Sequence, residues 1–148
     1  MLQRLIIPLS LLACVALLSC QSYTTTLTQS PGRVDEAATI STLHSIAKAQ
    51  IAYSVSNGGS YGTFEQLSEG GYLDSRFNSS KPVLYGYALT MTATPKLSDP
   101  AASSYSCSAD PRSAPNAKGR HFYIDSSTPE VHANATQPAT ASDEIVKP

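Results

Sequence analysis

A glycine-rich segment carries the first residues with the spacing of a catalytic motif. Gly58-Gly59-Ser60-Tyr61-Gly62 has the G-x-S-x-G pattern of a serine nucleophile, and His121 lies downstream, where a general base would be needed. This motif activates a serine only on a sharp strand-to-helix turn of an α/β sheet, where strain projects the hydroxyl group. Here the segment follows a helical pattern, and no alternation of strands and helices surrounds it. We therefore interpret this segment as an ordinary turn. A small hydrolase that uses Ser60 ranks third among the candidate functions, after the two given at the end of this subsection.

Three histidines and one acidic turn are the candidate metal ligands. His44, His121 and His132 are far apart in the sequence. His121 and His132 could meet across a hairpin, but a zinc site needs a third protein ligand. Residues 125–127 (DSS) and Glu130 carry oxygens that could bind calcium, and a solvated hairpin turn explains the same residues. We predict no metal ion and no cofactor, and we leave the calcium alternative open.

Four tyrosines in the second half of the chain could stack against a ligand. Tyr85, Tyr87, Tyr105 and Tyr123 fall in segments with the alternation of strands. In a sheet that packs on a helix, such tyrosines more often border the core and keep the hydroxyl group in water. We prefer that interpretation. Since none of these residues makes a case for catalysis, we expect no enzyme activity and predict no catalytic residue.

Length and charge exclude further classes of protein. The chain has 148 residues, which indicates one domain. Ten Lys and Arg residues stand against eleven Asp and Glu residues, so the formal net charge is -1. Neutralising phosphates takes a basic stripe, and the sequence has none, so nucleic acid is not an expected partner.

The first twenty residues have the pattern of a targeting segment. Arg4 supplies one positive charge, and residues 5–18 form a nearly unbroken apolar run. The run is too short to span a bilayer comfortably, which takes about 20 residues, but it fits the apolar region of a secretory signal peptide. It ends in Leu17-Leu18-Ser19-Cys20, which resembles the lipobox of bacterial lipoproteins.

That resemblance implies where the protein is attached. In bacterial lipoproteins the signal is cut before the cysteine, whose sulfur receives a diacylglycerol and whose new amine is acylated. It implies a lipoprotein signal peptide over residues 1–19, lipid attachment at Cys20, and a protein anchored to a membrane. Gln21 stands where Asp often retains lipoproteins in the inner membrane, so the resemblance favours the outer membrane, on its periplasmic or surface face.

The cysteines leave no internal disulfide. Cys14 departs with the signal, Cys20 carries lipid, and Cys107 has no partner in the mature chain. A buried thiol that behaves as a small hydrophobic group is the preferred interpretation of Cys107. A bridge between molecules, or a redox role, is the alternative.

A tether and a long helix follow the anchor. Residues 20–30 contain the lipidated cysteine and a hydroxyl-rich run, which we interpret as a flexible tether that lets the head move about 15–20 Å. Ser30-Pro31 is a helix start, and Asn57-Gly58-Gly59 is a helix stop. Between them an apolar stripe at spacings of three and four predicts an amphipathic helix of about twenty residues. The stripe consists of Ile40, Leu43, Ala47, Ile51 and Ser54.

Strands follow the long helix. Thr63-Phe64-Glu65-Gln66 has the spacing of a capping box, so a short helix should begin there and stop at Gly70-Gly71. Alternating residues then predict strands over 85–91, 105–109, 120–125 and 131–134, the last two as a hairpin, whereas residues 135–148 should be disordered. The order predicts an α+β fold, with one long N-terminal amphipathic helix packed on a small antiparallel sheet in a domain over 31–134.

The mature region from about Val34 to Asp143 resembles the globular head of type IV pilins and of the pseudopilins of type II secretion. The helix segment 36–53 is similar to the amphipathic half of the pilin spine helix. The resemblance continues through Tyr61-Gly62, the segment 67–74 and Gly86-Tyr87. It closes with GRHFYIDSS at 119–127, Asn134 and PATASD at 138–143. The motifs occur in the same order as in the family.

The sequence departs from the pilins at its N-terminus. A pilin opens its spine with Phe-Thr-Leu-Ile-Glu and a long apolar helix half, which here gives way to the lipobox and the tether. Since that half holds pilin filaments together, we expect a monomeric head that does not polymerise. The expected function is a non-enzymatic, lipid-anchored, pilin-like envelope protein, with pilus or secretion-system proteins as possible partners in pilus assembly, secretion or adhesion. The alternative is a periplasmic or surface ligand-binding lipoprotein with a pilin-like fold.

Overall fold

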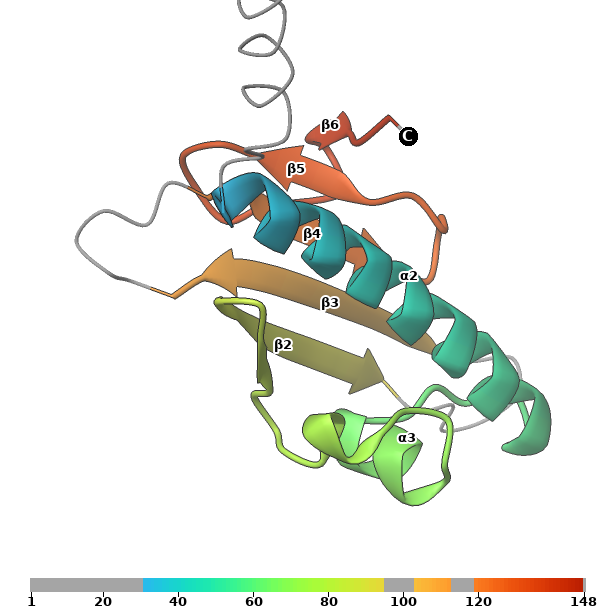
Figure 1. Ribbon diagram of the computed structural model, residues 1–148. Helices are drawn as coiled ribbons and strands as arrows, with labels where there is room; N and C mark the ends of the chain where they lie inside the picture. The colour runs from blue at the N-terminus through green and yellow to red at the C-terminus, as the bar shows by residue number, and fades with distance from the viewer. Residues whose placement is uncertain (1–30, 95–102, 113–118, 148) are drawn as a thin grey trace, which may run out of the picture. The chain divides into compact units, whose positions relative to one another are not determined.

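The computed structural model describes residues 31–94, 103–112 and 119–147, the side chains of residues 31–34 excepted. Cys20, Ser30 and the predicted signal peptide and tether lie outside these residues. Within them one long helix is followed by a short helix, a 3₁₀ turn and a six-stranded antiparallel sheet (Figure 1), so the α+β prediction is confirmed. The elements are α2 (Pro31–Ser56), α3 (Phe64–Glu69), η1 (Ser75–Phe77), β1 (Val83–Leu84), β2 (Tyr87–Thr94), β3 (Ser104–Pro111), β4 (His121–Asp125), β5 (His132–Asn134) and β6 (Glu144–Ile145).

Helix α2 ends where the sequence predicts, but it has 26 residues instead of about twenty. Its C-terminal turn is closed by the Gly59 N–H, which donates to the Ser54 carbonyl at 2.8 Å. Gly58 and Gly59 have φ angles of 63° and 86°, which glycine adopts without strain. The N-terminal part is held at the start of β4 by Glu36, whose carboxylate accepts hydrogen bonds from the backbone and guanidinium of Arg120, the residue before that strand, at 3.0–3.1 Å.

The buried face of α2 is rotated from the predicted stripe. Leu43 and Ala47 are buried as expected, but Ile51 is 57% exposed, so its assignment to the stripe is wrong. In this turn of the helix the residue that faces the core is instead Gln50, which is fully buried. A polar residue occupies the core there because Gln50 pairs with the backbone of Gly62, and Ile51 lies to one side of that contact.

We predict that Gln50→Leu destabilises the domain. The Gln50 Nε2 donates to the Gly62 carbonyl at 2.7 Å, and the Gly62 N–H donates to the Gln50 Oε1 at 2.9 Å. Leucine would leave both backbone groups unpaired in the core, which costs about 1–3 kcal/mol per group. Urea unfolding measures the loss, with Ala52→Leu on the exposed side of the same helix as the control, where less than about 0.5 kcal/mol is expected. Equal losses would show that the Gln50 bridge contributes nothing.

The short helix behaves as the sequence predicts. The Thr63 side chain accepts a hydrogen bond from the Gln66 N–H, and the Gln66 side chain accepts one from the Thr63 N–H, so the capping box is complete. Phe64 and Leu67 are buried. Helix α3 thereby attaches the connection after α2 to the core.

The sheet is a meander in which each strand pairs with the next one in the sequence. Alternate residues of β2, β3 and β4 face α2, which crosses this side of the sheet (Figure 1). Leu43, Ile46 and Ala47 of α2 belong to one apolar core with them. The buried strand residues are Tyr87, Leu89, Tyr105, Cys107, Ala109, Phe122 and Ile124.

The first predicted strand begins two residues too early. Tyr85 and Gly86 form the two-residue turn between β1 and β2, with φ angles of 51° and 77°. A tyrosine in this left-handed conformation costs about 1–2 kcal/mol. The alternation of Tyr85 with Tyr87 concealed the turn, because tyrosine is favoured in strands and Asn, Asp or Gly is usual at this turn position.

The prediction that residues 135–148 are disordered is wrong for the described residues 135–147. Glu144 and Ile145 pair with β5 as a sixth strand, and the Val146 N–H donates to the Val131 carbonyl at 2.8 Å. Ala139 is only 5% exposed. The domain therefore extends beyond its predicted limit at residue 134.

Asp143 explains why this polar segment is ordered. Its carboxylate accepts hydrogen bonds from the Thr140 backbone, the Thr140 hydroxyl and the Asn134 amide at 2.7–2.9 Å. The Asn134 bond first, and the Thr140 bonds next, hold the pKa of Asp143 below its usual range. The segment is ordered through polar contacts, which a hydrophobic pattern does not reveal.

Both edges of the sheet have features that oppose association with another chain. β1 and β6 have two residues each. Lys81-Pro82 precedes β1, and Lys147 follows β6 after Val146. Short strands, lysine and proline are the usual means by which proteins block pairing at a free edge.

Candidate functional site

The side of α2 that faces away from the sheet is exposed and bordered by two hollows. Ser41, Ser45 and Lys48 are exposed, as predicted. Ser41 and Ser45 line both hollows, so they form the crest between them. Since concave surfaces bordered by fixed elements are where small proteins bind partners, these two hollows are the candidate sites.

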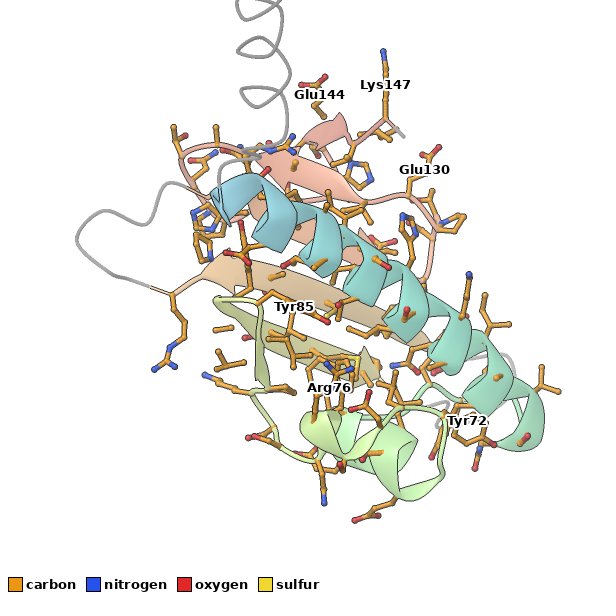
Figure 2. All side chains as sticks on the ribbon, in the orientation of Figure 1. Tyr72, Arg76, Tyr85, Glu130, Glu144 and Lys147 are labelled. Atoms are coloured by element: carbon orange, nitrogen blue, oxygen red, sulfur yellow. The ribbon has the colours of Figure 1, made fainter. Side chains whose placement is uncertain are left out.

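The larger hollow, here called the C-terminal groove, lies between α2, the β4–β5 loop and the chain after β6. Its volume is about 1030 Å³. Val131 and Val146 give it apolar side chains, and Figure 2 shows Glu130, Glu144 and Lys147 pointing outward, away from α2. The groove is lined by Ala37, Ile40, Ser41, His44, Ser45, Lys48, Pro129, Glu130, Val131, Ile145, Val146 and Lys147.

The smaller hollow, here called the tyrosine pocket, lies on the other side of α2 and has a volume of about 500 Å³. Asp74 and Arg76 form a bidentate pair there, with N–O distances of 2.9 and 2.8 Å. The Arg76 side chain first, and its backbone N–H next, lower the pKa of Asp74 to about 2. The pocket is lined by Ala38, Ser41, Thr42, Ser45, Tyr72, Leu73, Asp74, Arg76, Phe77 and Tyr85.

Ser60 and His121 are not brought together. The backbone N–H of Tyr61, next to Ser60, donates to Ser103 at the start of β3. His121 lies beside Asp110, near the other end of that strand. Residues 104–109 separate Ser103, which directly precedes β3, from Asp110, a distance of about 23 Å along the strand. The geometry therefore gives Ser60 no base in His121, and the G-x-S-x-G segment follows a helix instead of a strand.

His121 and His132 lie on neighbouring strands but do not form a pair. His121 is opposite Asn134 and His132 is opposite Tyr123, so the histidines are diagonal neighbours. The His121 Nδ1 is 2.6 Å from an Asp110 carboxylate oxygen, and the His132 Nδ1 is 2.8 Å from the Asp143 carbonyl. No group of three or more metal-ligating side chains occurs among the described residues.

The Asp125 carboxylate is already satisfied by the turn that carries it. Oδ1 accepts hydrogen bonds from the Ser127 backbone and hydroxyl, and Oδ2 accepts one from the Tyr123 hydroxyl at 3.2 Å. Burial opposes the charged form, but these hydrogen bonds outweigh it and lower the pKa of Asp125. Both Asp125 oxygens therefore take part in the hydrogen bonds of the hairpin turn.

The four tyrosines of the predicted stacking platform are scattered. Tyr87 and Tyr105 are buried in the core, where burial raises the pKa of each to about 12. Tyr123 lies on the opposite face of the sheet, opposite Ser108. Of these four tyrosines, Tyr85 alone lines either of the two hollows described, where it is joined by Tyr72, which lies in the segment 67–74 of the pilin resemblance.

Cys107 is fully buried in the core, as the preferred interpretation predicts. Burial raises the pKa of its thiol to about 12, so the thiol is neutral at physiological pH. A neutral, inaccessible thiol is a poor nucleophile for disulfide exchange. The geometry therefore disfavours an intermolecular bridge at this position.

Comparison of the chain with family models, with curated proteins and with solved structures finds no match. The function is therefore proposed from the sequence and the geometry. Among the described residues, no helix combines the length and the apolar character that a membrane crossing requires.

Proposed function

We propose that the chain is a lipid-anchored, non-enzymatic, pilin-like envelope protein, attached at Cys20, which contacts pilus or secretion-system proteins through its head. The order of elements carries the proposal. A 26-residue helix begins eleven residues after the lipobox cysteine and lies across an antiparallel meander, as a pilin head would be arranged. The outer membrane, on its periplasmic or surface side, is the proposed location.

The C-terminal groove is the proposed contact surface of the head. It has apolar side chains at its base and charged residues around it, which is the usual composition of a protein interface. Lys48 lies on its α2 wall and is exposed. The protected edges of the sheet favour contact through side chains over strand addition.

Site-specific photocrosslinking in native membranes tests this role. We expect a benzophenone side chain at Lys48 to give a discrete crosslink to a pilus or secretion component. The matched control is Thr92, which is exposed on the opposite face of the sheet and should give none. Absence of a crosslink at Lys48, or equal products from both positions, would contradict a contact surface on α2.

A ligand-binding lipoprotein is the second candidate function. The tyrosine pocket favours it, because this pocket combines an aromatic residue that the core does not use with a fixed pair of charged side chains. Its volume lies within the range of about 300–1,000 Å³ for small-molecule sites.

A further inference from the structure

Tyr85 occupies a position that its residue type makes unfavourable. The two-residue turn that it forms with Gly86 needs positive φ at both positions, and Asn, Asp or Gly normally supplies the first. A side chain that strains a turn usually persists because it serves packing or function. The Tyr85 side chain is 44% exposed, so burial does not explain its presence.

The ring of Tyr85 borders the tyrosine pocket. Figure 2 shows Tyr85 and Arg76 beside each other, on the side of α2 that faces α3. The Asp74 carboxylate first, through its hydrogen bonds, and the Tyr85 hydroxyl next raise the pKa of Arg76. The turn therefore places an aromatic surface against a charged pair.

The charged pair has no net charge, and its Arg76 and Asp74 side chains are 56% and 51% exposed. Asp74 caps η1 by accepting the Arg76 backbone N–H at 2.9 Å, and it accepts the guanidinium at the same time. An anionic ligand would be repelled by the Asp74 carboxylate, and a cationic ligand would be repelled by the Arg76 guanidinium. An arginine has five N–H donors, so some remain for a neutral ligand that offers oxygen acceptors.

The α2 wall adds hydroxyl oxygens that can accept hydrogen bonds. The Thr42 hydroxyl donates to the Ala38 carbonyl at 2.8 Å, and the Ser45 hydroxyl donates to the Ser41 carbonyl at 2.9 Å. Because each hydroxyl already donates its proton to a backbone carbonyl, both oxygens can only accept hydrogen bonds from a ligand. Tyr72 adds a second aromatic ring, which is held edge-on by Tyr53 at 5.5 Å between ring centres.

We propose that the tyrosine pocket binds a neutral saccharide. A sugar presents hydroxyl groups that donate and accept, together with C–H faces that pack on aromatic rings. The pocket offers the complement: N–H donors of Arg76, acceptor oxygens of Thr42 and Ser45, and the rings of Tyr72 and Tyr85. This inference specifies the ligand of the second candidate function and rests on it, and it does not involve the docking of proteins at the C-terminal groove.

Tyr85→Asn separates a binding role from a structural one. Asparagine suits the left-handed turn position, so the variant should fold and have a melting temperature no lower than that of the wild type. It removes the aromatic ring from the pocket. A side chain that served only stability would give a lower melting temperature in the variant.

Saturation-transfer NMR on the mature full-length lipoprotein in lipid nanodiscs provides the measurement, with maltotetraose and N-acetylglucosamine tetrasaccharide as probes. We expect transfer to at least one probe from the wild type and at least a tenfold loss in Tyr85→Asn. The matched control is Glu130→Gln, in the C-terminal groove, which should bind as the wild type does.

Three results would overturn the proposal: no transfer to either saccharide, equal transfer in Tyr85→Asn, or equal loss in Glu130→Gln. Binding by the wild type that is lost in Tyr85→Asn supports it. A negative result in the saccharide experiment would not change the expected crosslink at Lys48. The two proposed functions are therefore tested independently.

Discussion

Leu43→Ala is expected to lower the free energy of unfolding by about 2–5 kcal/mol, as other core truncations of leucine do. Leu43 is 0% exposed and lies in the α2 face that packs on the sheet. The sheet and helix backbones on both sides limit how far the cavity can collapse. The truncation therefore removes apolar contacts without replacement. Urea denaturation, with the slope of the transition checked for constancy, measures the loss.

Lys48→Ala is the matched control on the same helix. Lys48 is exposed on the opposite side, so its replacement should change stability by less than about 0.5 kcal/mol. If Lys48→Ala leaves the stability unchanged, Lys48 can also be replaced by the benzophenone side chain without loss of the fold. Equal effects at the two positions would mean that the packing of α2 on the sheet has been assigned to the wrong face.

Much of the fold was predictable because its signals are local. The end of α2 follows from three residues, 57–59, and α3 follows from the pair Thr63 and Gln66. The hairpin of β4 and β5 follows from the alternation in 120–134. In each case neighbouring residues determine the element, and distant parts of the chain only support it.

The predictions were wrong where contacts between residues far apart in the sequence determine the structure. Gln50 is buried because Gly62 lies against it, and nothing in the helical period indicates that contact. The chain after residue 135 is ordered by Asp143 and its polar partners, although its composition resembles that of disordered segments. Tyr85 was assigned to a strand because Gly86 alone is a weak turn signal.

The candidate sites were less predictable than the fold. Both hollows are formed by α2 together with segments that begin sixteen residues or more after its end. Neither Arg76 nor Tyr72 belongs to a catalytic or metal-binding motif, and Tyr72 stands out only as part of the segment 67–74 that resembles the pilins. The close spacing of Asp74 and Arg76 was the available signal, because an aspartate two residues before an arginine can cap a turn and pair with the side chain.

Cys20→Ala should abolish lipid attachment completely. By resemblance to bacterial lipoproteins, the Cys20 sulfur receives the lipid and the chain is cut before it, so alanine removes both the acceptor and the cleavage site. Each buried acyl methylene contributes about 0.8 kcal/mol to membrane binding, so several chains on one residue give an essentially permanent anchor. The unmodified variant should retain its uncut signal segment.

Metabolic labelling with a radioactive fatty acid, followed by the intact mass of the purified chain, tests the lipid anchor most directly. The matched control is Cys107→Ala, which removes the other cysteine of the mature chain and should label as the wild type does. We expect label in the wild type and in Cys107→Ala, a mass that corresponds to a chain beginning at an acylated Cys20, and no label in Cys20→Ala. Label that persists in Cys20→Ala, or a wild-type chain without label, would contradict it.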